Sequence, residues 1–208
     1  MARRRQKGKS GKWFARLIMA VLAVPALYLT AAMSGLRKGE LVALRWRAVD
    51  WPAARISVRQ NYTRGEFGTP KSKRSTRSVP MADAVGGELE RLFKASRWQR
   101  DDDLVFAHPA TGEVLAKSNV SRRMRAALKA AGLDERRRFH DLRHSFGTQM
   151  AAAGVPLRTL QEFMGHRDLT TTQIYADYAP SAREAEMVAA AFQTQPRPRL
   201  PSVESAGI

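Results

Sequence analysis

Most of this chain shows the spacing of hydrophobic residues that is typical of amphipathic helices. Gly132 and Gly154 stand where two such stretches end, and Pro156 stands where a new helix would begin. The pattern predicts helices over residues 36–44, 82–97, 117–131, 140–153, 156–164, 169–178 and 181–193. The chain is therefore expected to be mostly helical.

Alternating hydrophobic and polar positions predict short strands near the front of the chain. Residues 54–59 alternate most clearly, and two further strands are expected over residues 66–69 and 76–81. The polar segment 70–75 between those two is expected to form the tip of a hairpin. The predicted fold class is α+β, with a small antiparallel sheet near the N-terminal side of a mainly helical domain.

The apolar run over residues 17–33 has two interpretations. A basic segment precedes the run, as it does in secretory signals and membrane anchors. However, the run is short for a spanning helix, which needs about 20 apolar residues, and Pro25 interrupts it. It also leads into Ser34 without a hydrophilic spacer. We interpret residues 13–33 as a buried helix, kinked or broken at Pro25, and keep the signal or anchor as the alternative.

The charge balance indicates a polyanionic partner. The 208 residues carry 36 Lys and Arg against 19 Asp and Glu, which gives a net charge of +17. Nucleic acid is the commonest partner of such a protein, and a merely soluble or ribosome-like basic protein is the alternative. A basic helix over residues 117–131 carries Arg122 and Arg123, which are expected DNA contacts. Residues 1–12 are expected to be a flexible basic arm, and residues 194–208 a disordered, proline-containing tail.

Composition also excludes two kinds of site. The chain contains no cysteine, so disulfides and thiolate metal sites are excluded, and a reducing cytoplasm suits the protein. The hydrophobic fraction of 44% is sufficient for a folded core of one good-sized domain or two small ones.

Candidate chemistry begins at His140 and Arg143. On a helix, residues three apart share a face, so an imidazole and a guanidinium would point together, as in a grip on phosphate. A solvated charge pair at a helix start is the alternative. His140 and His144 also have the spacing of a zinc pair. Arg143 on the same face opposes a dication, and Asp141 stands where a zinc motif has Glu, so no metal site is expected.

A second motif joins Gly165 and His166 to Tyr175, nine residues after the histidine. Gly165 would end one helix and turn His166 sharply away from it. Tyr175 would lie about two turns along the next helix and be presented rigidly. A free phenol has a pKa near ~10, so nearby cations would be needed to favour its attack. Simple packing is the alternative for Tyr175, and it is our interpretation of Tyr178.

Two further segments carry candidate cations. Arg37 would start a helix, where backbone N–H groups also favour anions, and Glu40 could orient it. Lys71 lies in the predicted hairpin tip, from which it could protonate a leaving oxygen. Lys73 and Arg74 compete with Lys71 for that role, or contact backbone phosphates as a solvated basic tip.

These residues together resemble the catalytic domain of the tyrosine recombinase (phage integrase) family. Each motif alone is weak, but their order and spacing match the family pattern over roughly residues 28–193. The matching stretches are residues 34–41, Pro70–Lys71, His140–His144, Gly165–His166 and Tyr175.

The resemblance implies a mechanism for cutting and rejoining DNA. Tyr175 would attack the scissile phosphate, form a 3′-phosphotyrosyl link and release a 5′-hydroxyl. Arg37 and Arg143 would neutralise the non-bridging oxygens. His140 and His166 would hydrogen-bond the phosphate, and His140 could also accept the tyrosine proton.

The resemblance also implies the remaining participants. Lys71 would protonate the leaving 5′-oxygen, and a second strand would then attack the covalent link. The bond energy stays in that link, so no metal or other cofactor is expected. The implied partners are double-stranded DNA and further copies of the chain, as a tetramer on DNA, with no membrane. The implied location is the cytoplasm, in association with the nucleoid.

One departure from the family pattern bears on activity. Typical members carry an N-terminal helical domain that grips the other face of the DNA, whereas only residues 1–27 precede the pattern here. Weak and poorly sequence-specific DNA binding is therefore expected. The leading hypothesis is a site-specific recombinase without that domain. The alternatives are a truncated, inactive DNA-binding remnant or accessory protein of a mobile element and, from residues 17–33 alone, a membrane-anchored basic protein.

Overall fold

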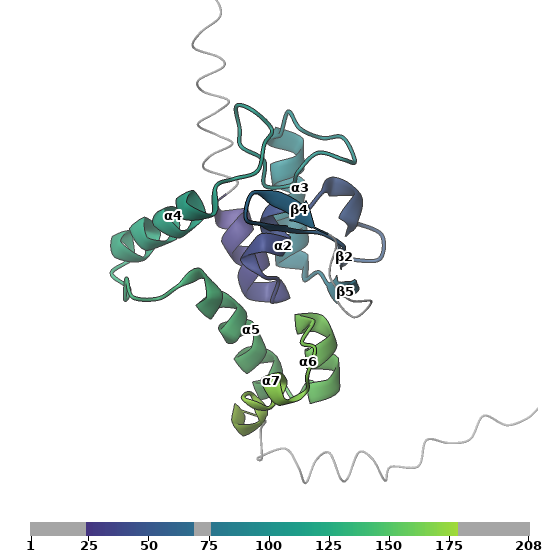
Figure 1. Ribbon diagram of the computed structural model, residues 1–208, viewed down its shortest axis with the longest axis vertical. Coiled ribbons are helices and arrows are strands. Elements are labelled where there is room, and N and C mark those ends of the chain that lie inside the picture. The colour runs from purple at the N-terminus through teal and green to yellow at the C-terminus, as the bar shows by residue number, and fades with distance from the viewer. Residues whose placement is uncertain (1–23, 69–75, 179–208) are drawn as a thin grey trace, which may run out of the picture.

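A computed structural model describes residues 24–68 and 76–178, which are about half helical with a small amount of antiparallel sheet (Figure 1). Several expectations fall outside this range and are not addressed by the structure. They are the basic arm over residues 1–12, Lys71, Lys73, Arg74, the helix over residues 181–193 and the tail over residues 194–208.

The N-terminal half is built around a three-stranded antiparallel sheet. Residues 24–34 form a helix that includes Pro25. The elements that follow are α2 (Lys38–Val42), η1 (Trp46–Ala48), β1 (Val49–Asp50), β2 (Arg55–Val58), β5 (Arg77–Pro80) and α3 (Asp83–Ala95). The strand order is β1-β2-β5, with Ile56 opposite Val49 on one side and Val79 on the other.

A second, two-stranded sheet corrects the predicted hairpin. β3 (Asn61–Thr63) pairs with β4 (Glu66–Gly68), whereas β5 pairs with β2. The strands predicted over residues 66–69 and 76–81 therefore exist, but they lie in different sheets rather than in one hairpin. Ile56 and Val79 are fully buried opposite each other, which explains why β5 pairs with β2.

The C-terminal half is helical. Its elements are α4 (Lys117–Ala130), α5 (Phe139–Ala152), α6 (Leu157–Met164), α7 (Thr170–Gln173) and η3 (Ala176–Tyr178). In Figure 1, α5, α6 and α7 form a group on one side of the sheet-containing half, and α4 projects from the molecule. The helix predicted over residues 169–178 is thus one short helix and a 3₁₀ turn.

Two hydrophobic clusters make up the core. The larger is formed by the helix over residues 24–34, α2, the three-stranded sheet, α3, residues 105–106, α4 and the start of α5, with Phe106 and Leu89 fully buried. The smaller is formed by α5, α6 and the turn after α7, around Leu160 and Met164. In the described part of the chain, no helix has the length and apolar character needed to cross a bilayer.

Two helices start with the same local device. The backbone N–H of Arg37 donates to Glu40 Oε2 over 2.8 Å, and that of Arg138 donates to Asp141 Oδ2 over 2.7 Å. In each case an acidic side chain in the first turn caps the backbone before the helix, as in a capping box. These caps fix the starts of α2 and α5, from which Arg37 and Arg143 extend.

Candidate active site

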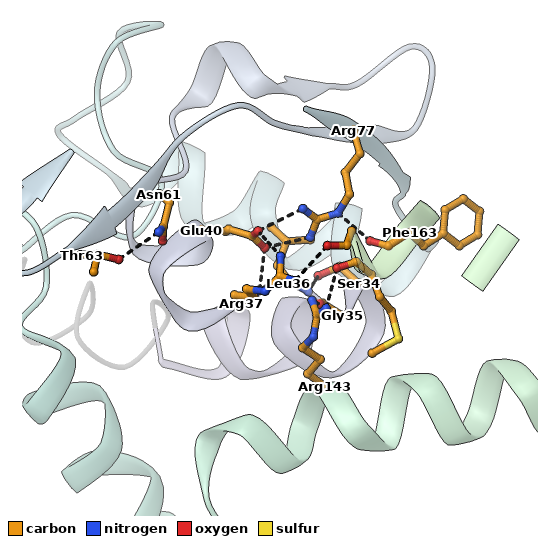
Figure 2. A network of polar contacts seen from close by, with 12 residues as sticks. Ser34, Gly35, Leu36, Arg37, Glu40, Asn61, Thr63, Arg77, Arg143 and Phe163 are labelled. Atoms are coloured by element: carbon orange, nitrogen blue, oxygen red, sulfur yellow. Dashed lines mark hydrogen bonds and ion pairs between the residues drawn. The ribbon is translucent and has the colours of Figure 1, made fainter. Parts of the chain in front are cut away.

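Glu40 holds two arginines from different parts of the chain. Arg77 of β5 donates to both carboxylate oxygens, over 3.0 and 2.8 Å, and Arg37 donates to Glu40 Oε1 over 3.0 Å (Figure 2). The side chains of Arg77 and Glu40 are only 5% and 7% exposed, whereas that of Arg37 is 42% exposed. Glu40 therefore orients Arg37 toward solvent while it forms a buried ion pair with Arg77.

Arg143 is buried at the boundary between the two clusters. Its guanidinium donates to the carbonyl oxygens of Gly35 and Met164. Burial and then the charge of Arg37 lower the pKa of Arg143 to about 9, so the side chain is still cationic at neutral pH. Arg143 therefore places a positive charge, only 3% exposed, beside the start of α2.

Three arginines converge on the C-terminal end of α6. Arg77 donates to the Phe163 carbonyl over 2.7 Å, Arg143 donates to that of Met164, and Arg37 donates to that of Gly165 over 2.9 Å. The last carbonyls of a helix lack partners within the helix and carry partial negative charge. The end of α6 thus gathers the guanidinium groups into one place.

Gly165 ends α6, as the sequence predicted, and its conformation also allows this convergence. It ends α6 in the left-handed conformation at φ 61°, and His166 N–H returns to the Gln161 carbonyl over 3.1 Å. A side chain at Gly165 would also press on the guanidinium of Arg77. His166 then leaves the helix axis toward the arginines.

His166 is held as a neutral imidazole. Its Nδ1 lies 2.9 Å from Oγ1 of the buried Thr172. Burial, followed by the charges of Arg143 and Arg37, lowers the pKa of His166 to about 4. The ring is therefore uncharged at pH 7, with Nε2 as its second polar atom.

Tyr175 lies in the turn between α7 and η3 and not on a helix, which corrects the sequence prediction. Its side chain is 3% exposed, packs with Phe146, Leu160 and Met164, and touches α5 at Gly147. Its hydroxyl lies 2.9 Å from Nδ1 of His144. Packing and this hydrogen bond, rather than a helix, hold the phenol in place.

The phenol lies close enough to Arg143 for the charge of the guanidinium to act on it. Burial raises the pKa of Tyr175, and the positive charge of Arg143 acts in the opposite direction. His140 stands at the edge of the same group, with its ring edge-on to that of His144 at 4.8 Å between centroids. The fold therefore brings Arg37, His140, Arg143, His166 and Tyr175 together from four separate segments.

Comparison with known proteins identifies the family of the chain. A model of the phage integrase family matches residues 22–181. The chain belongs to the phage integrase family.

Curated relatives in this family are considerably longer. The chain is 29% identical over 182 residues to a tyrosine recombinase XerC-like protein of Caldanaerobacter subterraneus, covering 76% of this chain and 46% of that protein. It is 33% identical over 149 residues to tyrosine recombinase XerD of Pseudomonas putida, covering 70% and 46%. The chain spans less than half the length of these relatives.

Solved structures of phage integrase type confirm the fold. The Tn1549 transposon integrase in complex with transposon right end DNA has a TM-score of 0.69 at 20% identity, covering 92% of this chain and 67% of that one. XerA recombinase has a TM-score of 0.63 at 24% identity, covering 96% and 68%. The catalytic domain of bacteriophage HP1 integrase has a TM-score of 0.52 at 17% identity, covering 88% and 96%. The predicted α+β catalytic-domain fold is therefore confirmed.

A strongly basic groove adjoins the candidate site at His140. We call it the basic groove. It is lined by five cationic side chains and one carboxylate, that of Glu135, together with Ser121, Met124 and Phe139. The cationic residues are Lys38, Arg125, Arg136, Arg137 and Arg138. A second groove contains His166 together with Arg55, Arg77 and Arg158. His140 and His166 thus each lie where a cationic groove meets the arginine cluster.

Some predicted DNA-binding residues lie elsewhere. Arg122 and Arg123 are exposed on α4, where Arg122 bonds Asn119 over 2.9 Å and Arg123 borders a groove with Tyr28. Neither lines the basic groove, so their contact with DNA stays a prediction. Among the residues that the structure describes, no set of three or more histidine and carboxylate side chains is arranged to hold a metal ion.

Sequence reasoning missed three residues of the site. Arg77 is one of many arginines, and its strand pattern gives no sign of a partner 37 positions away. His144 was considered only as a zinc ligand, although its spacing from His140 placed both rings on one face. Gly147 lies within α5, where a glycine is unfavourable, and that was the available signal of a close contact.

Proposed function

We propose that this chain is a site-specific recombinase that breaks and rejoins DNA through a 3′-phosphotyrosyl intermediate. Membership of the phage integrase family and the convergence of catalytic side chains support the proposal. The observation that carries it is Tyr175, whose hydroxyl is fixed by His144 beside the charge of Arg143.

The chemistry assigns a role to each gathered group. A phosphodiester bound at the end of α6 would receive N–H donors from Arg37 and Arg143 in place of the Gly165 and Met164 carbonyls. Fixed guanidinium groups stabilise the charge that develops on a pentacoordinate phosphorus. Neutral His166 can donate a hydrogen bond from Nε2 when Nδ1 accepts from Thr172. Lys71 remains the proposed acid for the leaving 5′-oxygen.

Double-stranded DNA is the proposed partner. The net charge of +17 and the grooves at both histidines suit two stretches of backbone phosphate on either side of a bound phosphodiester. We also propose that copies of the chain associate on DNA, as a tetramer during strand exchange. The protein would then act in association with the nucleoid.

Covalent trapping tests this proposal. Nicked duplexes of randomised sequence serve as the probe, because the short downstream fragment diffuses away after cleavage and prevents religation. Wild-type protein should form an adduct that survives denaturation. Tyr175→Phe should form none and should bind DNA within about threefold of wild type, because the phenol adds nucleophilicity rather than affinity. Tyr178→Phe is the matched control and should retain the adduct.

Two results would count against the proposal. If wild-type protein binds the duplexes but forms no adduct, the chain is a DNA-binding module, as the alternative hypothesis holds. If Tyr175→Phe still forms the adduct, another residue is the nucleophile.

A further inference from the structure

His144 is the side chain in direct contact with the nucleophilic atom of the proposed reaction. Its Nδ1 lies 2.9 Å from the Tyr175 hydroxyl, and the two rings are tilted at 49° with centroids 6.2 Å apart. The residue follows Arg143 on α5, one turn after His140. The sequence pattern gave it no catalytic role.

The Tyr175 hydroxyl needs a proton acceptor when it attacks. Burial raises the pKa of Tyr175, which keeps the phenol protonated at neutral pH despite the opposing effect of Arg143. Within residues 24–68 and 76–178, the hydrogen bond recorded for this hydroxyl is the one to His144. Arg143 cannot accept a proton, because a guanidinium has donors only.

We propose that His144 is a catalytic residue that takes the proton of Tyr175 as the phenol attacks the scissile phosphate. This inference rests on the proposed function. In the step, the O–H bond of Tyr175 breaks and its proton moves to Nδ1 of His144. An oxygen lone pair of Tyr175 forms the new bond to phosphorus. The bond from phosphorus to the 5′-oxygen breaks, and that oxygen keeps the electron pair and takes a proton from the acid on the leaving side.

The positive charge around His144 favours the protonation of only one histidine during the step. His140 stands edge-on at 4.8 Å, and burial, followed by the charges of His144 and Arg143, lowers the pKa of His140. His166 is neutral at pH 7 for the same kind of reason. Two adjacent imidazolium groups beside Arg143 would repel each other. The contact with Tyr175 thus gives the proton to His144 and leaves His140, at the basic groove, to contact phosphate.

Single-turnover kinetics test the inference. The probe is a nicked duplex recovered from the randomised pool as a substrate of wild-type protein. His144→Ala removes the contact, and His144→Asn leaves an amide that can hydrogen-bond the phenol but cannot take its proton. Both variants should slow adduct formation by about 100-fold or more, the usual size of a general-base contribution. DNA affinity should be unchanged. His108→Ala, which changes a histidine on a distant loop, should react like wild type.

A second substrate shows whether His144 acts on the nucleophile or on the leaving group. When the 5′-oxygen is replaced by sulfur, the leaving group departs without a proton, so variants that lack the acid recover. His144→Ala should stay slow on this substrate, because it lacks the acceptor on the nucleophile side.

Three results would overturn the inference. If His144→Asn reacts within about threefold of wild type, the residue supplies only a hydrogen bond. Recovery of His144→Ala on the sulfur substrate would place the residue on the leaving-group side. Equal rates for His144→Ala and wild type would remove any role while leaving the proposed function intact. That function itself fails if wild-type protein forms no adduct or if Tyr175→Phe still forms one, and the inference then fails with it.

Discussion

At the scale of single residues, Glu40 decides the geometry of the arginine cluster. Burial by itself would raise the pKa of this carboxyl, but the hydrogen bonds and charges of Arg77 and Arg37 outweigh burial and lower it. An ion pair this deeply buried is costly to break from one side, because the remaining charge stays buried without compensation. Glu40 therefore links the stability of the fold to the placement of Arg37.

The pH dependence of stability tests this role. Because the pKa of Glu40 is lower in the folded than in the unfolded chain, its contribution is complete above the unfolded pKa and is lost as pH falls through the folded one. Glu40→Gln should lower the free energy of unfolding at pH 7 by about 3 kcal/mol. Urea unfolding at several pH values should show this difference in free energy shrinking in acid. Glu40 of the wild type is then protonated and uncharged, like the glutamine of the variant.

An exposed acidic residue provides the control. Glu90 pairs with Lys94 on the surface of α3, and Glu90→Gln should leave stability essentially unchanged. A difference between wild type and Glu40→Gln that stayed constant down to the lowest pH would contradict the ion-pair account.

Gly147 is the second decisive residue, because it allows Tyr175 to pack on α5. A Cβ at this position would overlap the Tyr175 ring. Gly147→Ala should therefore displace the phenol and destabilise the fold by about 1–3 kcal/mol, as overpacking does. Nitration of Tyr175, followed by peptide mass spectrometry, should become faster than in wild type.

A glycine in an open environment separates packing from helix propensity. Gly87 lies in α3, and a Cβ there would meet only the end of Arg91 at 4.0 Å. Gly87→Ala should stabilise the protein by about 0.5–1 kcal/mol, since alanine favours helix more than glycine does. If Gly147→Ala behaved in the same way, Tyr175 would not pack on α5 as described.

At the scale of elements, residue spacing predicted most helices and three strands but not their pairing. The helices over residues 82–97, 117–131 and 140–153 appear close to the predicted bounds, because their apolar periodicity is long. β1 and β3 were missed, and β1 has only two residues, too few to show any alternation. The pairing of β5 with β2 depends on burial of Ile56 against Val79, which spacing along the chain does not contain.

The same limit applies to the functional elements. The order of motifs pointed to Arg37, Arg143, His166 and Tyr175, because their types and local spacing are informative. The convergence of three arginines on the end of α6 was not predictable, because it depends on how two clusters meet in space. Tyr175 was placed on a helix because residues 169–178 have helical spacing, but α7 ends at Gln173.

The basic groove makes a prediction about salt dependence. Each phosphate contact that is lost should reduce the slope of log affinity against log salt by about 1. Arg125→Ala combined with Arg137→Ala should therefore reduce the slope on random duplex by about 2. Arg122→Ala combined with Arg123→Ala tests the contacts predicted from sequence in the same assay.

A pair on another helix controls for net charge. Arg91→Ala combined with Lys94→Ala removes the same charge from α3, and neither residue lines the basic groove. This control should leave the slope nearly unchanged. If the Arg91/Lys94 variant reduced the slope as much as the Arg125/Arg137 variant, overall charge, and not the groove, would determine DNA binding.

At the scale of the whole molecule, the site lies where the two hydrophobic clusters meet. Arg37 and Arg77 reach from the sheet-containing half to the end of α6, and Arg143 reaches back from α5 to Gly35 (Figure 2). The groups that would bind phosphate therefore also join the two halves. Tyr175 belongs to the smaller cluster, so its place relative to the arginines depends on that junction.

The most direct test of this account is to identify the residue that becomes linked to DNA. The trapped adduct is digested with protease and nuclease, and the modified peptide is sequenced by mass spectrometry. The account predicts a nucleotide joined through its 3′-phosphate to Tyr175. A nucleotide on Tyr178 or on any other residue would contradict it.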